Sequence, residues 1–62
     1  MNYGELKRLL RKSKCRFDHD GGRHEMWYSP ITDTYFPVPR HDGHEVPQGT
    51  LKSILRDAGI KQ

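Results

Sequence analysis

The sequence predicts an α+β domain in which one helix, three short strands and a second helix follow one another. Apolar side chains recur at helical spacing near both ends of the chain, and turn residues divide the middle into three strand-length segments. A three-stranded antiparallel sheet with both helices on one face would bury both apolar stripes and one face of the sheet. With 62 residues, the chain is expected to form a single domain over residues 1–62.

The first helix is expected over residues 2–13. Its apolar stripe consists of Tyr3, Leu6, Leu9 and Leu10. Four cations are spread over the remaining faces, namely Lys7, Arg8, Arg11 and Lys12. An apolar stripe with charged faces around it is typical of an amphipathic helix that packs on one side only.

Three strands are expected over residues 14–18, 24–28 and 34–38. The first alternates polar and apolar residues, and the second is rich in aromatic residues. Asp20-Gly21-Gly22 predicts a hairpin turn between them, because glycine readily adopts the positive φ that such turns need. Pro37 and Pro39 limit the ladder of the third strand, since proline cannot donate a backbone hydrogen bond.

The second helix is expected to follow the polar loop of residues 40–45. Pro47 fits its first turn, where a missing N–H does no harm. Leu51, Ile54, Leu55 and Ala58 form its apolar face. Gly59 followed by the apolar Ile60 predicts the end of the helix, with a hydrophobic contact back onto its last turn.

Charge is distributed unevenly along the chain, which carries a net charge of +3. Residues 1–16 hold six Lys and Arg against one Glu, a net +5, and residues 51–62 have a net +2. Residues 17–50 have a net charge of −4. Two basic ends are typical of a protein that binds a polyanion, although a solvated helix surface gives the same pattern.

No metal site, cofactor or disulfide is expected. Cys15-x3-His19 and His41-x2-His44 contain possible ligands, but structural zinc sites prefer paired cysteines, and this chain has one cysteine. A single cysteine fits a reducing compartment. The sequence has no apolar run near the roughly 20 residues of a membrane span and no signal peptide pattern. We therefore expect a soluble cytoplasmic protein without membrane contact.

His24 is the candidate functional residue that the pattern singles out. It follows a flexible turn and begins the second strand, and imidazole exchanges protons near neutral pH. Alternation places His24, Met26 and Tyr28 on one face of the sheet, so His24 lies at the edge of the core if the Met26 face is buried. A strand-end histidine with a local hydrogen bond explains the same position without catalysis.

Four segments, in order and with short gaps, resemble the HicA family of toxins from bacterial and archaeal toxin–antitoxin modules. They are "GELKRLLRKSKCRF", "GGRHEMWYSP", "FPVPRH" and "VPQGTLKSILRDAGI". The resemblance covers nearly the whole chain and implies a fold like that of a double-stranded-RNA-binding domain. It also implies a toxin that cleaves mRNA and arrests growth, an endoribonuclease of the mRNA interferase type, and a HicB-type antitoxin that neutralises it.

The resemblance also implies site residues. In the family the active histidine stands two positions after a glycine, and Gly22 and His24 match this motif, while Arg23 replaces the serine often found between them. The resemblance thus implies that His24 is the catalytic residue. Arg23, directly beside it, is a candidate for stabilising a phosphate, although an ordinary solvated turn residue explains the same position. Basic residues of the first helix are expected to follow the RNA backbone: Lys7, Arg8, Arg11 and Lys12.

The expected chemistry is metal-independent attack of a ribose 2′-OH on the adjacent phosphate, with His24 as general base or general acid. A second proton-transferring group is not singled out, and His19, His41 and Glu25 are its candidates. Two alternatives remain open. One is an RNA-binding module without catalysis, and the other is a decayed toxin that binds its antitoxin but cleaves nothing.

Overall fold

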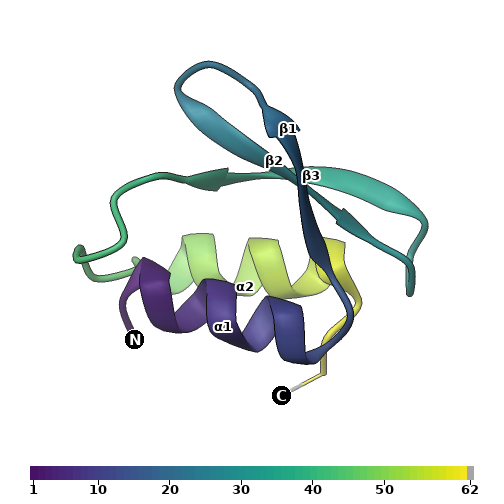
Figure 1. The fold of residues 1–62 in the computed structure, drawn as a ribbon. Helices are drawn as coiled ribbons and strands as arrows, with labels where there is room; N and C mark the ends of the chain where they lie inside the picture. The colour runs from purple at the N-terminus through teal and green to yellow at the C-terminus, as the bar shows by residue number, and fades with distance from the viewer. Residues whose placement is uncertain (62) are drawn as a thin grey trace.

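The chain folds as a three-stranded antiparallel sheet with two helices below it (Figure 1). A computed structural model describes residues 1–61. The elements in chain order are α1 (Tyr3–Lys12), β1 (Arg16–Asp20), β2 (His24–Ser29), β3 (Thr34–Pro39) and α2 (Gln48–Ala58). The predicted α-β-β-β-α order, the antiparallel sheet and the placement of both helices are confirmed. Among the described residues, no helix has both the length and the apolar character needed to cross a membrane.

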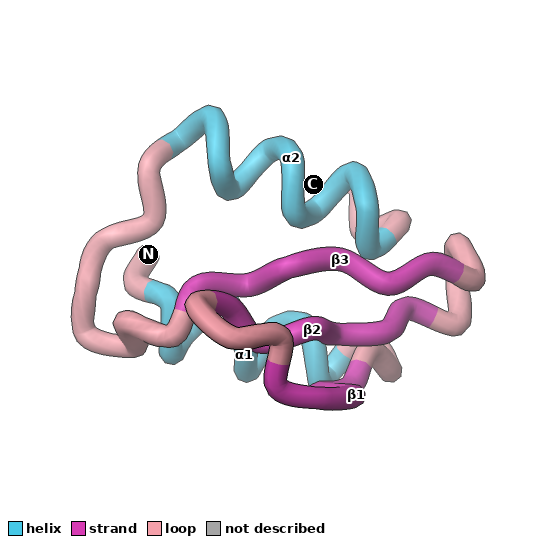
Figure 2. The backbone as a smooth tube through the Cα atoms, turned by 90° about the horizontal axis from the view of Figure 1, so that it is seen from above, coloured by secondary structure: helices cyan, strands magenta, loops and turns pink. Residues whose placement is uncertain are grey.

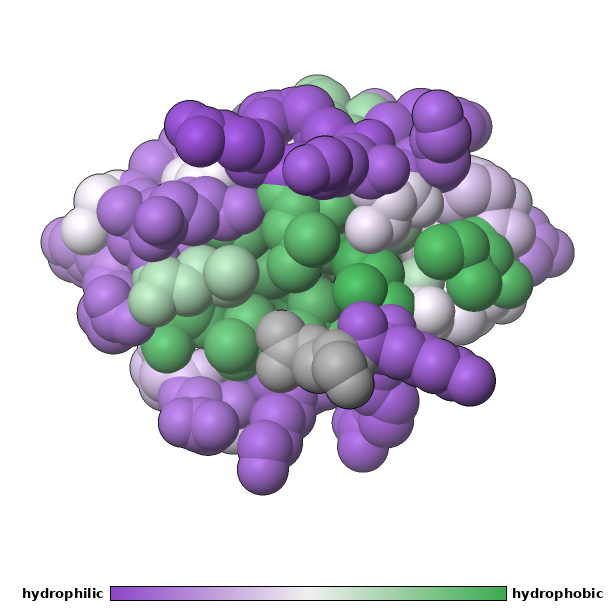
Figure 3. Space-filling model, turned by 90° about the horizontal axis from the view of Figure 1, so that it is seen from below, coloured by the Kyte–Doolittle hydropathy of each residue, from purple (hydrophilic) through white to green (hydrophobic). Residues whose placement is uncertain are grey.

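The two helices lie differently with respect to the sheet. Seen from above in Figure 2, α1 runs behind the strands, whereas α2 lies outside the β3 edge. Figure 3 shows the opposite side of the molecule, where apolar side chains fill the space between two hydrophilic borders. The last turn of α2 lies close to the start of β3, whereas its first turns lie farther from the end of this strand, and the candidate site occupies this region.

A capping box starts α1. The Asn2 side chain accepts a hydrogen bond from the Glu5 backbone N–H at 2.8 Å, and the Glu5 carboxylate accepts one from the Asn2 N–H, also at 2.8 Å. The helix then buries Leu6 and Leu10 completely. Full burial of a leucine side chain contributes about 1.5–3 kcal/mol, so this stripe anchors α1 to the sheet.

The inner face of the sheet carries Trp27, Phe36 and Val38, each 1% exposed or less. Trp27 pairs directly with Phe36 across β2 and β3. The Met26 face, on which His24 lies, is therefore the outer face and not the core. Trp27 decides the orientation because it is the largest side chain on either face of β2, and its burial removes the most apolar area from water.

Hydrogen bonds join the end of α2 to the turn between β2 and β3. The hydroxyl of Ser29, which is fully buried, donates to the Ala58 carbonyl at 2.6 Å, and the hydroxyl of Thr32 donates to the Asp57 carbonyl at 2.7 Å. Helices leave their last carbonyls without intrahelical partners, and these side chains supply partners for two of them. Gly59 ends α2 in the left-handed conformation, as predicted.

The start of α2 differs from the prediction by one residue. Pro47 lies just before the helix as its N-cap, with a ψ of 145°, and Gln48 is the first helical residue. Proline suits this position because its fixed φ leads the chain into the helix. Unlike Asn2 in α1, however, it offers no side-chain oxygen to the first N–H groups, and no side-chain hydrogen bond caps α2.

Candidate active site

A tightly held turn presents His24 at the start of β2. The Gly21 N–H donates to the His24 carbonyl at 2.9 Å, and the Asp20 carboxylate accepts from the Gly22 N–H at 3.0 Å. Gly22 has a φ of +86°, a conformation that other residues rarely adopt. The Gly22-x-His24 spacing therefore has a structural cause, because the glycine reverses the chain directly before the strand that carries the imidazole.

Arg40 fixes the same turn from the end of β3. Its guanidinium donates to the Gly22 carbonyl at 2.7 and 3.0 Å and forms an ion pair with Asp20. A planar guanidinium that makes several bonds at once restricts the turn more than a single contact does. The sequence did not single out Arg40, although it belongs to the "FPVPRH" segment.

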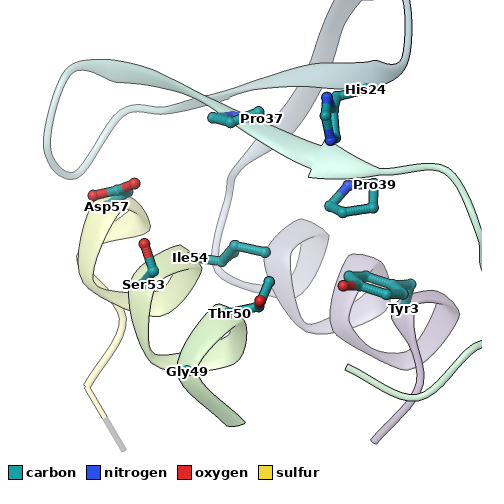
Figure 4. Close-up of a pocket in the computed structure, with 9 residues that line it drawn as sticks. All are labelled: Tyr3, His24, Pro37, Pro39, Gly49, Thr50, Ser53, Ile54 and Asp57. Carbon is teal, nitrogen blue, oxygen red and sulfur yellow. The ribbon is translucent and has the colours of Figure 1, made fainter. Parts of the chain in front are cut away.

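His24 lines a pocket of about 400 Å³ between the sheet and α2 (Figure 4). Residues from four elements line it: Tyr3 from α1, His24 from β2, Pro37 and Pro39 from β3, and Gly49, Thr50, Ser53, Ile54 and Asp57 from α2. In Figure 4 the imidazole is drawn above the end of β3, and the helices lie below this strand. An exposed imidazole thus shares a cavity with hydroxyl groups of both helices.

The two prolines of β3 form the wall between His24 and α2. Pro39 is the register partner of His24, and Pro37 is the partner of Met26. Because proline has no N–H, this edge of the sheet offers fewer donors to an additional strand. Their rings also give the wall a rigid apolar surface, and an apolar wall with a few convergent polar groups is typical of small-molecule and substrate sites.

The loop before α2 brings Tyr3 to the pocket. The Tyr3 N–H donates to the His44 carbonyl at 3.0 Å, the Gly4 N–H donates to the Asp42 carbonyl at 2.9 Å, and the Val46 N–H donates to the Met1 carbonyl at 2.9 Å. These bonds hold the start of α1 beside the loop that leads into α2. Tyr3 belongs to the apolar stripe, and its role in lining a pocket was not predicted.

The basic residues predicted for RNA binding fall into two groups. Lys7 is 3% exposed, and its ammonium group pairs with Glu25 at 3.1 Å and Asp42 at 2.5 Å. Glu25 also accepts a hydrogen bond from the Trp27 indole at 2.9 Å. Lys7 therefore joins α1, β2 and the following loop inside the fold, and we do not retain it as an RNA contact. The others are exposed: Arg8, Arg11, Lys12 and Arg23.

Replacing Lys7 with alanine is expected to lower the free energy of unfolding by about 1–3 kcal/mol. The Glu25 carboxylate, with a side chain 20% exposed, would lose a charged hydrogen-bond partner. Arg8→Ala is the matched control, because Arg8 is the next residue of α1 and is exposed. Urea denaturation of both variants measures the difference. Equal stability of Lys7→Ala and Arg8→Ala would refute this structural role.

The candidates for a second proton-transferring group lie outside the pocket lining. His19 bonds to Asp18 at 2.7 Å, His41 stacks on His44 with 5.1 Å between ring centroids, and Glu25 pairs with Lys7. Cys15 is buried in the core. Within residues 1–61, no three His, Cys, Asp or Glu side chains are grouped so as to hold a metal ion.

Two groups with raised pKa values lie outside the pocket lining. A hydrogen bond to Asp33, at 2.6 Å, raises the pKa of the Tyr28 hydroxyl on the outer sheet face. A hydrogen bond to Glu45 raises the pKa of the N-terminal ammonium group. Both shifts follow from a carboxylate that stabilises the protonated partner. They mark local structure rather than a reactive centre.

This small domain of two helices and a sheet has a histidine in a pocket between its layers. The family model described as the HicA toxin of bacterial toxin–antitoxin systems matches residues 3–60. The chain therefore belongs to the HicA toxin family, and the matched range includes Gly22, His24 and every residue that lines the pocket. Membership gives the chain a toxin role and implies an antitoxin partner. No curated protein and no solved structure is significantly similar to the chain.

Proposed function

We propose that this toxin is a metal-independent endoribonuclease that cleaves mRNA and is neutralised by a HicB-type antitoxin. The observation that supports this most directly is the position of His24. Its exposed imidazole lines a pocket of about 400 Å³ together with the hydroxyl-bearing Tyr3, Thr50 and Ser53. A general acid or base has to be reachable by substrate, and His24 meets this requirement while His19 and His41 do not line the pocket.

The proposed reaction is a transesterification within the RNA. The ribose 2′-oxygen forms a bond to the adjacent phosphorus, and the bond from phosphorus to the 5′-oxygen of the next nucleotide breaks. One fragment ends in a 2′,3′-cyclic phosphate, and the other begins with a 5′-OH. His24 takes the proton from the 2′-OH or gives a proton to the departing 5′-oxygen, and such proton transfer accelerates a reaction typically about 10²–10⁴-fold.

Exposed cations outside the pocket provide the proposed contacts to the rest of the RNA. Arg23 precedes His24 directly, and Arg8, Arg11 and Lys12 lie on the exposed side of α1. Arg and Lys on a surface bind phosphates without regard to base sequence, so they supply affinity rather than specificity. An antitoxin that covers the pocket would block both the imidazole and the path of the strand.

The test is incubation of purified protein in EDTA with a single-stranded mRNA and, separately, with single-stranded DNA of the same sequence. We expect the RNA to be cut and the DNA to remain intact, because DNA lacks the attacking 2′-OH. Electrophoresis of the products shows this directly. Binding of RNA without cleavage would instead identify a non-catalytic RNA-binding module. Absence of both binding and cleavage would identify a decayed toxin.

A further inference from the structure

Tyr3 is buried, yet its hydroxyl group has no partner in the described part of the chain. The residue is 7% exposed, and no hydrogen bond to its hydroxyl is present among residues 1–61. Figure 4 shows the hydroxyl pointing across the pocket, toward the side of Thr50. No buried polar side-chain atom of the described residues lacks a partner, so the unpartnered Tyr3 hydroxyl opens into the pocket, where it can donate to a ligand that supplies an acceptor.

The first turn of α2 faces the same pocket with free backbone donors. Gly49 and Thr50 both line it. Pro47 provides no side-chain cap, and the N–H groups of residues 48–50 have no hydrogen-bond acceptor within the described residues. At α1, by contrast, the loop carbonyls of His44 and Asp42 accept from the first N–H groups. Free N–H groups and the helix dipole of an 11-residue helix favour an anion at this end.

Gly49 in this turn has no side chain that could cover the pocket. A Cβ atom built at Gly49 would meet no atom beyond its own helix backbone and chain neighbours within 4 Å, so the space on that side of the residue is open. Thr50 and Ser53 add hydroxyl groups to the lining. Tyr3 on one side and the first turn of α2 on the other thus line the same pocket, with donors from two elements.

The nearby carboxylates do not repel an anion from this end of the pocket. Asp57 is the carboxylate of the lining, and it lies eight residues further along α2, roughly 12 Å at 1.5 Å per residue. Glu45 and Asp42 belong to the preceding loop and are paired, with the N-terminal ammonium at 2.6 Å and with Lys7 at 2.5 Å. The dipole of α2 therefore acts on the pocket without a free carboxylate beside it.

We infer that the first turn of α2 and the Tyr3 hydroxyl bind a phosphate group of the RNA, in the pocket that also holds His24. This inference rests on the proposed function and deepens it, because it assigns the end of the pocket that receives the phosphodiester. The lining contains no Lys or Arg, so backbone N–H groups and hydroxyls make the contacts. Such contacts hold a phosphate without reading the bases.

Nuclear magnetic resonance of the ¹⁵N-labelled protein tests this inference separately from catalysis. Two ligands are titrated into the wild type: inorganic phosphate, and a single-stranded RNA oligonucleotide made non-cleavable by 2′-O-methylation. We expect both to shift the Gly49 and Thr50 amide signals. Tyr3→Phe is expected to weaken both affinities about tenfold or more, since a hydrogen bond to a charged group is lost. Tyr35→Phe is the matched control, because Tyr35 is exposed on β3 outside the pocket.

Each outcome decides the matter. Unmoved Gly49 and Thr50 signals in the wild type would overturn the inference whatever Tyr3→Phe does, as would equal affinities of Tyr3→Phe and Tyr35→Phe. Shifts with inorganic phosphate but not with the oligonucleotide would also overturn it, since they would show a site for free anions. Amide shifts without RNA cleavage would uphold the phosphate site and refute the proposed ribonuclease. Cleavage without amide shifts would refute the phosphate site and support the proposed ribonuclease.

Discussion

His24→Ala is expected to reduce the rate of RNA cleavage by about 10²–10⁴-fold while the protein stays folded. The imidazole is exposed and outside the core, so its removal leaves no cavity. The contact that closes the turn is made by the His24 backbone carbonyl, which alanine retains. The expected loss is therefore chemical, because the variant lacks the group that transfers the proton.

A matched variant shows whether the loss of cleavage is specific to His24 or follows from the removal of any exposed histidine. His41→Ala removes an exposed imidazole from the loop of residues 40–46, outside the pocket lining, and should cleave at the wild-type rate. Cleavage rates on one RNA, with circular dichroism of each variant, give the comparison. Equal rates for His24→Ala and the wild type would remove His24 from the mechanism, and an unfolded His24→Ala would contradict its placement outside the core.

Gly59→Ala is expected to lower the free energy of unfolding by about 2–5 kcal/mol, the largest stability effect that we predict. Gly59 has a φ of +76°, and this conformation costs other residues about 1–2 kcal/mol. The added Cβ would also lie 2.7 Å from Ile31 Cγ2 and 2.8 Å from Thr32 Cγ2. Overpacking of this kind costs typically about 1–3 kcal/mol.

Thermal denaturation followed by circular dichroism measures this effect. A loss of 2 kcal/mol or more corresponds to a decrease in Tm of at least about 8 °C in a domain of this size. Gly49→Ala is the control, because Gly49 lies within α2 at an ordinary φ and has open space around its Cβ position. Alanine there should leave the Tm unchanged or raise it slightly. Equal Tm values for the two variants would contradict the account of Gly59.

The secondary structure and topology could be predicted because local signals determine them. The apolar stripes, the Gly21-Gly22 turn and the stop at Gly59 each act within a few residues. The choice of the inner sheet face could not be made from alternation, since both faces of β2 carry large side chains. Burial of Trp27 against Phe36 settles it, and that contact depends on how β2 and β3 pack on the helices.

The candidate site could be predicted only at His24, where a turn and a family motif coincide. Lys7 was expected among the cations on the outer faces of the first helix, but it is buried. The sequence pattern could not show this, because its partners Glu25 and Asp42 are 18 and 35 positions away in sequence. Tyr3 and Ser53 were not predicted as pocket residues for a similar reason. They come from opposite ends of the chain, and the offset of α2 from the β3 edge brings them into one cavity.

The most direct test of the central claim, that His24 promotes attack of a ribose 2′-OH, is the chemistry of the new RNA ends. Wild-type protein and His24→Ala are incubated in EDTA with an RNA that has one preferred cleavage position, and the 3′ ends are identified by mass spectrometry. The account predicts a 2′,3′-cyclic phosphate from the wild type and almost no product from His24→Ala. A 3′-OH paired with a 5′-phosphate, or cyclic ends in equal amounts from both proteins, would contradict it.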